Sequence, residues 1–167
     1  MAWINNDGLR LRYGTEKATP TKAGDYLSYG EDRTIELFID VSTLTTTAAI
    51  QDYATVIPAG VFVDSVILEA TTAAATITSL SIGAVKLDYT TNIADNAFAD
   101  AVVVADLNGA GETKVLTGPP ASGGAGTKVG TTFGSDAGYI TAKIAGSAGT
   151  GVIKVLIKYR GVPPITQ

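Results

Sequence analysis

The sequence contains no cysteine and no histidine among its 167 residues. Without cysteine the chain can form neither a disulfide framework nor a thiolate metal site. Without histidine it lacks the usual general base, the commonest zinc ligand and any histidine-based catalytic triad. An enzyme built on this chain would have to work with carboxylates or lysine. These absences favour a protein that is not an enzyme and that uses no cofactor.

Long apolar runs are also missing. No segment approaches the roughly 20 apolar residues that a membrane-spanning helix needs. The opening "MAWINNDGLR" has neither the basic region nor the apolar run of a signal peptide. We therefore expect no membrane partner and synthesis in the cytoplasm of the cell that makes the chain.

Charge is scarce. Charged residues make up 17% of the chain and hydrophobic residues 46%, which favours self-association or docking onto a partner. An alanine- and threonine-rich β-domain would share this composition. The net charge is −4, and basic clusters interleaved with aromatic residues are missing. The sequence therefore argues against nucleic-acid binding.

Alternating apolar residues predict most of the strands. The stretches "TIELFIDV" (34–41), "GYITAKIAG" (138–146) and "VIKVLIKYR" (152–160) have the period of half-buried strands. The "SAGTG" between the last two predicts that they form a β-hairpin. In "VFVDSVILEA" (61–70) the alternation changes phase between Val63 and Val66, which predicts a β-bulge or a bend.

Further short strands are predicted at "YATVI" (53–57), "TITSLSIG" (76–83) and "VKLDY" (85–89). The stretch from 92 to 107 can hold either a short helix over 96–103 or a short strand. "NGAGE" and "GPPASGGAGTKVG" have the composition of flexible, poorly packed loops. About eight short strands with at most one helix predict a single all-β domain, a sandwich or a barrel.

Two constellations could suggest chemistry. The glycine-rich "GPPASGGAGTKVG" lacks the Gly-Lys-Ser/Thr that opens a helix in a phosphate-binding loop. Clustered acids and amides could gather oxygen ligands for calcium or act as paired acids, but their spacing fits no EF-hand. A solvated loop is the favoured interpretation for this second set, which consists of Asp88, Asn92, Asp95, Asn96, Asp100 and Asp106.

The first 33 residues contain too few apolar residues for a core of their own. The only tryptophan, Trp3, is expected to anchor in a pocket of this domain or of a neighbouring subunit. "GLRLRYG" would place Leu9, Leu11 and Tyr13 on one face of an extended segment, with Arg10 and Arg12 on the other. That arrangement suits addition of a strand to another sheet, with the arginines reaching partner carboxylates. A solvated strand is the alternative.

These patterns divide the chain into an extended N-terminal arm (1–33), a β-sandwich (34–162) and a C-terminal tail (163–167), where two prolines stop the last strand. The arm also carries further tyrosines. The residues predicted to contact a capsid or a neighbouring subunit are Trp3, Leu9, Arg10, Leu11, Arg12, Tyr13, Tyr26 and Tyr29.

Several stretches resemble known virion proteins. "DGLRLRYGTEKATPTKAGDY" resembles the opening of tailed-bacteriophage proteins encoded near the major capsid protein. "IPAGVFVDSVILEA", "LSIGAVKLDYT" and "AGYITAKIAGSAGTGVIKVLIKYR" resemble phage head decoration (cement) proteins, by pattern more than by signature residues. The resemblance covers most of the chain, although 107–131 has no counterpart in it.

The resemblance implies a jelly-roll-like β-sandwich on the outside of the capsid, in the virion. There it would bridge neighbouring major capsid subunits as a homo-oligomer, with a trimer favoured and a dimer as the alternative. Another virion part, such as a head fibre or a tail component, is a second hypothesis. A carbohydrate-binding β-sandwich is a third, but four of its five candidate aromatics lie in the arm, which argues against it: Trp3, Tyr13, Tyr26, Tyr29 and Tyr53.

Overall fold

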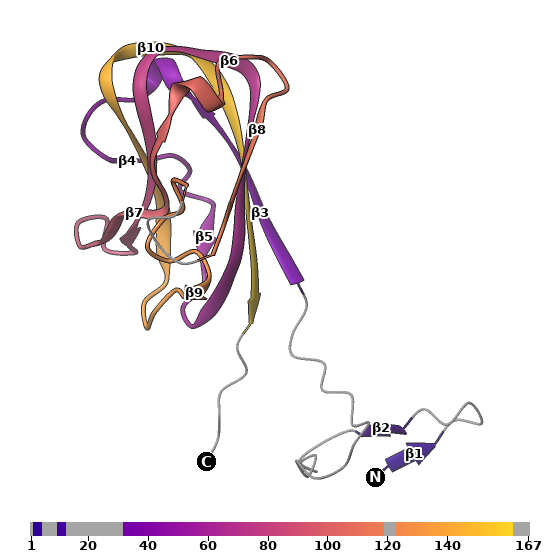
Figure 1. Ribbon diagram of the computed structural model, residues 1–167. Coiled ribbons are helices and arrows are strands. Elements are labelled where there is room, and N and C mark those ends of the chain that lie inside the picture. Colours follow the sequence, from indigo (N-terminus) through magenta and orange to yellow (C-terminus); the bar gives the residue numbers. More distant parts are fainter. Residues whose placement is uncertain (1, 5–9, 13–31, 119–122, 162–167) are drawn as a thin grey trace.

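The computed structural model describes residues 2–4, 10–12, 32–118 and 123–161, and they are almost entirely β-strand (Figure 1). Strands β1 (Ala2–Ile4) and β2 (Arg10–Arg12) form a small antiparallel sheet of their own. The other strands belong to one eight-stranded antiparallel sheet. Two 3₁₀ turns, η1 (Val41–Thr43) and η2 (Val104–Asp106), are the helical elements of the described chain. Neither is long enough to cross a membrane.

Two long strands organise the sheet. Strand β6 (Val61–Lys86) and strand β10 (Gly138–Gly161) run antiparallel along their whole length. Both bend in the middle, so that the pair folds over on itself (Figure 1). A strand that bends in this way contributes to both layers of a sandwich.

Each half of the bent pair carries its own neighbours. In the first layer the order is β3 (Asp32–Asp40), the end of β10, the start of β6 and β8 (Thr113–Thr117). Strand β9 (Thr131–Thr132) pairs with the first residues of β6.

The second layer is built from the other halves of β6 and β10. Strand β7 (Asn92–Val103) flanks β6, while β4 (Ala49–Ile50) and β5 (Val56–Ile57) flank β10. The predicted all-β, sandwich-like fold is confirmed. The jelly-roll strand order stays a prediction.

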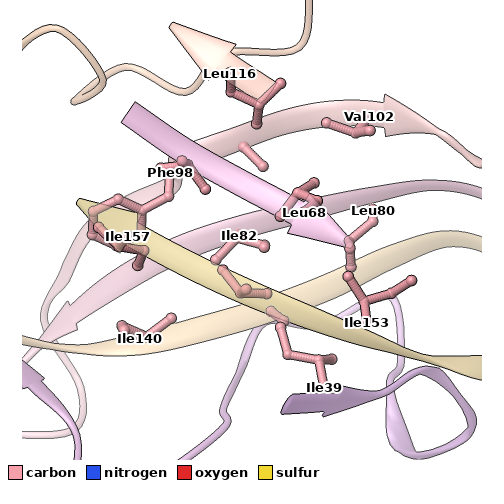
Figure 2. Close-up of a cluster of buried hydrophobic side chains, with 14 of the residues drawn as sticks. Ile39, Leu68, Leu80, Ile82, Phe98, Val102, Leu116, Ile140, Ile153 and Ile157 are labelled. Carbon is pink, nitrogen blue, oxygen red and sulfur yellow. The ribbon is translucent and has the colours of Figure 1, made fainter. Parts of the chain in front are cut away.

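The core lies between the two layers, where apolar side chains from crossing strands meet (Figure 2). In β3, Ile35, Leu37 and Ile39 are buried while the residues between them are exposed, as the alternation predicts. The labelled side chains of Figure 2 are all buried: Ile39, Leu68, Leu80, Ile82, Phe98, Val102, Leu116, Ile140, Ile153 and Ile157.

The predicted bulge in β6 is confirmed. Val63 lies opposite Tyr159 and Ser65 lies opposite Lys158, so that Asp64 is the extra residue on β6. The extra residue resets the alternation, and for that reason both Val63 and Val66 are buried.

The predicted hairpin at the end of the chain is wrong. Its two strands are one continuous strand, β10, and "SAGTG" is the corner where β10 passes from one layer to the other. Gly151 has a φ of +118° there, and a Cβ added to Gly149 would lie 2.5 Å from the Ala75 carbonyl oxygen. The glycines therefore allow two bent strands to approach closely. Because glycines are also typical of hairpin loops, the sequence alone does not distinguish the two structures.

The helix considered over 96–103 is also wrong, because these residues belong to β7. Phe98 and Val102 are both buried, and a spacing of four residues places two side chains on one face in a strand as well as in a helix. Register shifts between β6 and β7 add to the irregular pattern.

The stretch "GPPASGGAGTKVG", predicted to be a poorly packed loop, is in part well packed, because Ala125 and Val129 are fully buried. Residues 113–117, just before it, form β8. A Cβ on Gly126 would lie 2.4 Å from the Asn96 carbonyl oxygen, so this backbone rests directly on β7. Residues 119–122 lie outside the described part of the chain.

Candidate functional site

The residues predicted to make contacts fall on β1 and β2 or outside the described chain. Trp3 lies in β1, opposite Leu11 in β2, and the backbone of Arg10 to Arg12 is extended. Their contact with a partner stays a prediction. The remaining predicted contact residues lie outside the described residues: Leu9, Tyr13, Tyr26 and Tyr29.

The structure brings together three other tyrosines, which we call the tyrosine cluster: Tyr53, Tyr89 and Tyr139. Their ring centroids are 5.2–6.0 Å apart, and the rings of Tyr89 and Tyr139 are stacked at 12°. Tyr53 is 66% exposed and Tyr89 is 56% exposed. Such large exposed aromatic side chains are typical of binding surfaces.

A repeated sequence motif presents two of these rings. "DYATVI" (52–57) and "DYTTNI" (88–93) share the pattern Asp-Tyr-x-Thr-x-Ile. In each copy the tyrosine stands at the turn, and the isoleucine packs into or against the core, fully buried at Ile57 and half-buried at Ile93. The sequence prediction assigned 53–57 and 85–89 to strands and missed this signal. Strand pairing starts only at Val56, and β6 ends at Lys86.

The aspartate and the threonine of each motif lock the turn. Asp52 accepts a hydrogen bond from the Ala54 backbone N–H at 2.8 Å and another from the Thr55 hydroxyl. Asp88 accepts from the backbone N–H groups of Thr90 and Thr91, at 2.9 and 2.7 Å, and from the Thr91 hydroxyl at 2.5 Å. Side chains of this kind hold turns by bonding to the backbone two or three residues ahead.

Tyr89 is held in an unusual conformation. Its φ is +65°, in the left-handed region that a bulky residue rarely adopts. Backbone hydrogen bonds of the turn offset the cost of this conformation. The Tyr89 N–H donates to the Lys86 carbonyl, and the Lys86 N–H donates to the Thr91 carbonyl. Residues in this region are enriched at functional sites.

The hydrogen bonds shift the pKa of several groups. The Thr91 hydroxyl, followed by the backbone N–H groups of Thr91 and Thr90, lowers the pKa of Asp88 to about 2. The Thr55 hydroxyl lowers the pKa of Asp52 in the same way. The Tyr89 hydroxyl, 3.4 Å from that of Tyr139, raises the pKa of Tyr139.

A groove of ≈430 Å³ runs beside the cluster, on the outer face of the second layer, and Tyr89 is part of its wall. The Lys143 ammonium lies 2.6 Å from the Asp95 carboxylate, which also accepts a hydrogen bond from the Asn92 amide. Thr141 lies on the same strand, 5% exposed, and lines the groove as well. The volume of the groove is within the range of about 300–1,000 Å³ that is common for small-molecule sites.

The predicted carboxylate cluster does not come together as a metal site. Asp88 holds its turn, Asp95 pairs with Lys143, and Asp106 pairs with Lys114 at 2.9 Å. Within the described part of the chain, no group of three or more acids could hold a metal ion.

A second hollow, of ≈380 Å³, lies where β3 begins. Arg160 lines it, 3.5 Å from Asp64, with its guanidinium 4.8 Å from the ring centre of Phe62. Beside it, β3 pairs only with β10 among the described strands, so that its other edge carries no described neighbour.

Comparison with known proteins gives one likeness of fold. No family model matches the sequence, and no curated protein matches it either. A chain of the solved "Cyanophage Pam1 capsid asymmetric unit" has a similar fold, with a TM-score of 0.53 and 17% sequence identity. The likeness covers 90% of this chain and 99% of that chain. The two chains therefore share a fold along nearly their whole lengths.

Proposed function

We propose that this chain is a structural protein of a tailed-phage virion that binds the outer surface of the capsid and bridges neighbouring major capsid subunits. The observation that carries the proposal is the likeness in fold to a chain of a phage capsid, which extends over nearly all of both chains. The resemblance of the sequence to head decoration proteins supports the same role independently.

The mechanism we propose is mechanical. Each copy covers a seam between capsid subunits, and symmetry repeats the contact over the whole shell. A modest free energy per copy then adds up through multivalency, so that the filled head resists internal pressure. No catalytic step is part of the proposal.

The N-terminal arm is proposed as the strap of this attachment. In the sequence it leads into β3, whose first residues line the hollow that Arg160 also lines. The second edge of β3 has no partner among the described strands, and a strand edge without a partner is a template for pairing with another chain. We propose that the arm lies on a capsid subunit or on a neighbouring protomer of a trimer or dimer.

Adding the purified chain to heads assembled without it tests the proposal. Cryo-electron microscopy is expected to show new density on the outside of the shell, between neighbouring major capsid subunits. Heads that carry the chain are expected to retain their DNA at higher temperature. Density at the tail would instead support a tail component, and no density anywhere on the virion would overturn the proposal.

Truncation tests the arm. Deletion of residues 1–31 leaves β3 whole, because β3 begins at Asp32, and is expected to reduce capsid occupancy strongly. The double variant Arg10→Ala and Arg12→Ala is expected to bind less and with weaker salt dependence. Lys17→Ala with Lys22→Ala removes the same charge elsewhere in the arm and is the matched control. Undiminished occupancy after the deletion would contradict the strap.

A further inference from the structure

We propose that the groove beside the tyrosine cluster binds a neutral saccharide. Tyr89 forms part of the groove wall and packs against Tyr53 and Tyr139. The lining is otherwise rich in residues whose side chains donate and accept hydrogen bonds: Thr46, Thr47, Thr90, Thr141 and Asn92. A sugar ring has the same two characters, an apolar C–H face and a rim of hydroxyl groups, and Tyr side chains suit such a ligand because they combine an apolar body with a polar tip.

The charges at the groove do not favour an anionic ligand. The charged lining residues are Asp95 and Lys143, which pair with each other, so the lining carries no net charge and offers no net attraction to phosphate, sulfate or an acidic sugar. Further charged residues stand next to the lining or to the tyrosine cluster in the sequence or pair with such a residue: Asp52, Asp88, Lys86 and Asp136.

A cationic ligand is disfavoured as well. Each of these carboxylates is already engaged: Asp136 pairs with Lys86 at 3.0 Å, Asp95 pairs with Lys143, and the other two hold their turns. An aromatic cage for an ammonium group needs open ring faces around a central space. The three rings here have centroids 5.2–6.0 Å apart and pack against each other, which leaves no such space. An uncharged ligand remains.

Thr141 supplies an independent sign of a missing polar partner. Its side chain is among the few buried polar ones, 5% exposed, and lines the groove. Its hydroxyl makes no hydrogen bond to any residue that the structure describes, whereas buried polar groups in proteins almost always have a partner. A ligand hydroxyl in the groove would provide it. The Lys143 ammonium, which has three N–H donors, keeps donors free beyond its bond to Asp95.

The backbone that carries the three rings is held by hydrogen bonds within the chain. The aspartates of the two Asp-Tyr-x-Thr-x-Ile turns bond to the backbone after Tyr53 and Tyr89, and Tyr139 lies in β10. Tyr53 is 66% exposed and lies against Tyr89, a residue of the groove wall, so it can extend the apolar surface offered to a sugar face. Rigid aromatic anchors cost little entropy on binding.

A glycan array probed with the full-length chain, followed by saturation-transfer NMR, tests the proposal. The NMR probes are cellobiose, maltose and lactose as neutral sugars, with glucuronic acid and sialyllactose as anionic ones. Binding is expected for at least one neutral glycan and for neither anionic sugar. Tyr53→Ala is expected to weaken binding by about tenfold, and Thr141→Val is expected to weaken it by removing only the hydroxyl.

Phe38→Ala is the matched control, because Phe38 is a 57% exposed aromatic residue on β3, in the other layer. It is expected to bind sugar like the native chain, and circular dichroism confirms that each variant is folded. Absence of binding to every neutral glycan on the array, or native-like binding by Tyr53→Ala, would overturn the proposal. So would a loss of self-association or of capsid occupancy in Tyr53→Ala, which would identify the cluster as a protein contact.

Discussion

Glycine-to-alanine substitutions test the corner of β10. An added methyl group can destabilise the fold in two ways, by strain at a positive φ and by a clash of the Cβ with neighbouring backbone, and four glycines of this chain differ in which of the two applies. Gly151 combines a φ of +118° with a Cβ position only 2.6 Å from the Ala73 carbonyl oxygen. Gly149 has no left-handed φ, but its Cβ would lie 2.5 Å from the Ala75 carbonyl oxygen. Gly60 has a φ of +71° with open space around it, and Gly161 has neither problem.

The expected losses of unfolding free energy follow from these two costs. Strain in the left-handed region costs about 1–2 kcal/mol, and forcing a methyl group against backbone costs about 1–3 kcal/mol. We expect about 0 for Gly161→Ala, about 1 kcal/mol for Gly60→Ala and about 2 kcal/mol for Gly149→Ala. Gly151→Ala is expected to lose about 3–4 kcal/mol, the sum of both costs.

Thermal and urea unfolding followed by circular dichroism, at one protein concentration, measures the series. For a domain of this size about 3 kcal/mol corresponds to a shift in Tm of roughly 6–12 °C. The decisive variant is Gly149→Ala. In a free hairpin turn it would be neutral or stabilising by up to about 1 kcal/mol, whereas a close-packed corner makes it destabilising. A neutral result for both corner variants would refute the bent-strand architecture.

Two further predictions concern the core and the turns. Phe98 is fully buried and stacks on Phe133 with ring centroids 5.7 Å apart, so Phe98→Ala is expected to destabilise the chain by about 3–5 kcal/mol in urea unfolding. Phe38→Ala is the exposed control, expected to change stability by less than about 0.5 kcal/mol. Because the pKa of Asp88 is lowered from 3.8 to about 2, its contribution to the turn is complete above pH 3.8 and is lost as the pH falls toward 2. NMR of the Thr90 and Thr91 amides from pH 5 downward checks this, and a midpoint near the ordinary value would contradict it.

Much of the fold could be predicted because alternation reports directly which side chains face the core. Ile35, Leu37 and Ile39 follow that rule, and even the bulge at Asp64 is visible as a change of phase. Connectivity could not be predicted in the same way. "SAGTG" contains the residues of a turn, and only the three-dimensional contacts of Gly149 and Gly151 identify it as a corner within one strand.

The tyrosine cluster could be predicted only in part. The repeated Asp-Tyr-x-Thr-x-Ile pattern is present in the sequence and indicates two locked turns, each with an exposed ring. That the two turns meet, with Tyr139 beside them, depends on the pairing of β10 with both β5 and β6. Contacts between residues 36 to 86 positions apart in the chain, such as those among Tyr53, Tyr89 and Tyr139, are set by topology and leave no local trace.

The bent pair of strands also separates the two proposed activities in space. The first layer carries β3, into which the arm leads in the sequence, and the hollow lined by Arg160. The second layer carries the tyrosine cluster and its groove on its outer face. Because β3 and the tyrosine cluster lie in different layers, we expect the effects of Tyr53 variants and of arm deletions to be additive. A chain with both changes should lose capsid attachment and sugar binding by the same factors as the single variants.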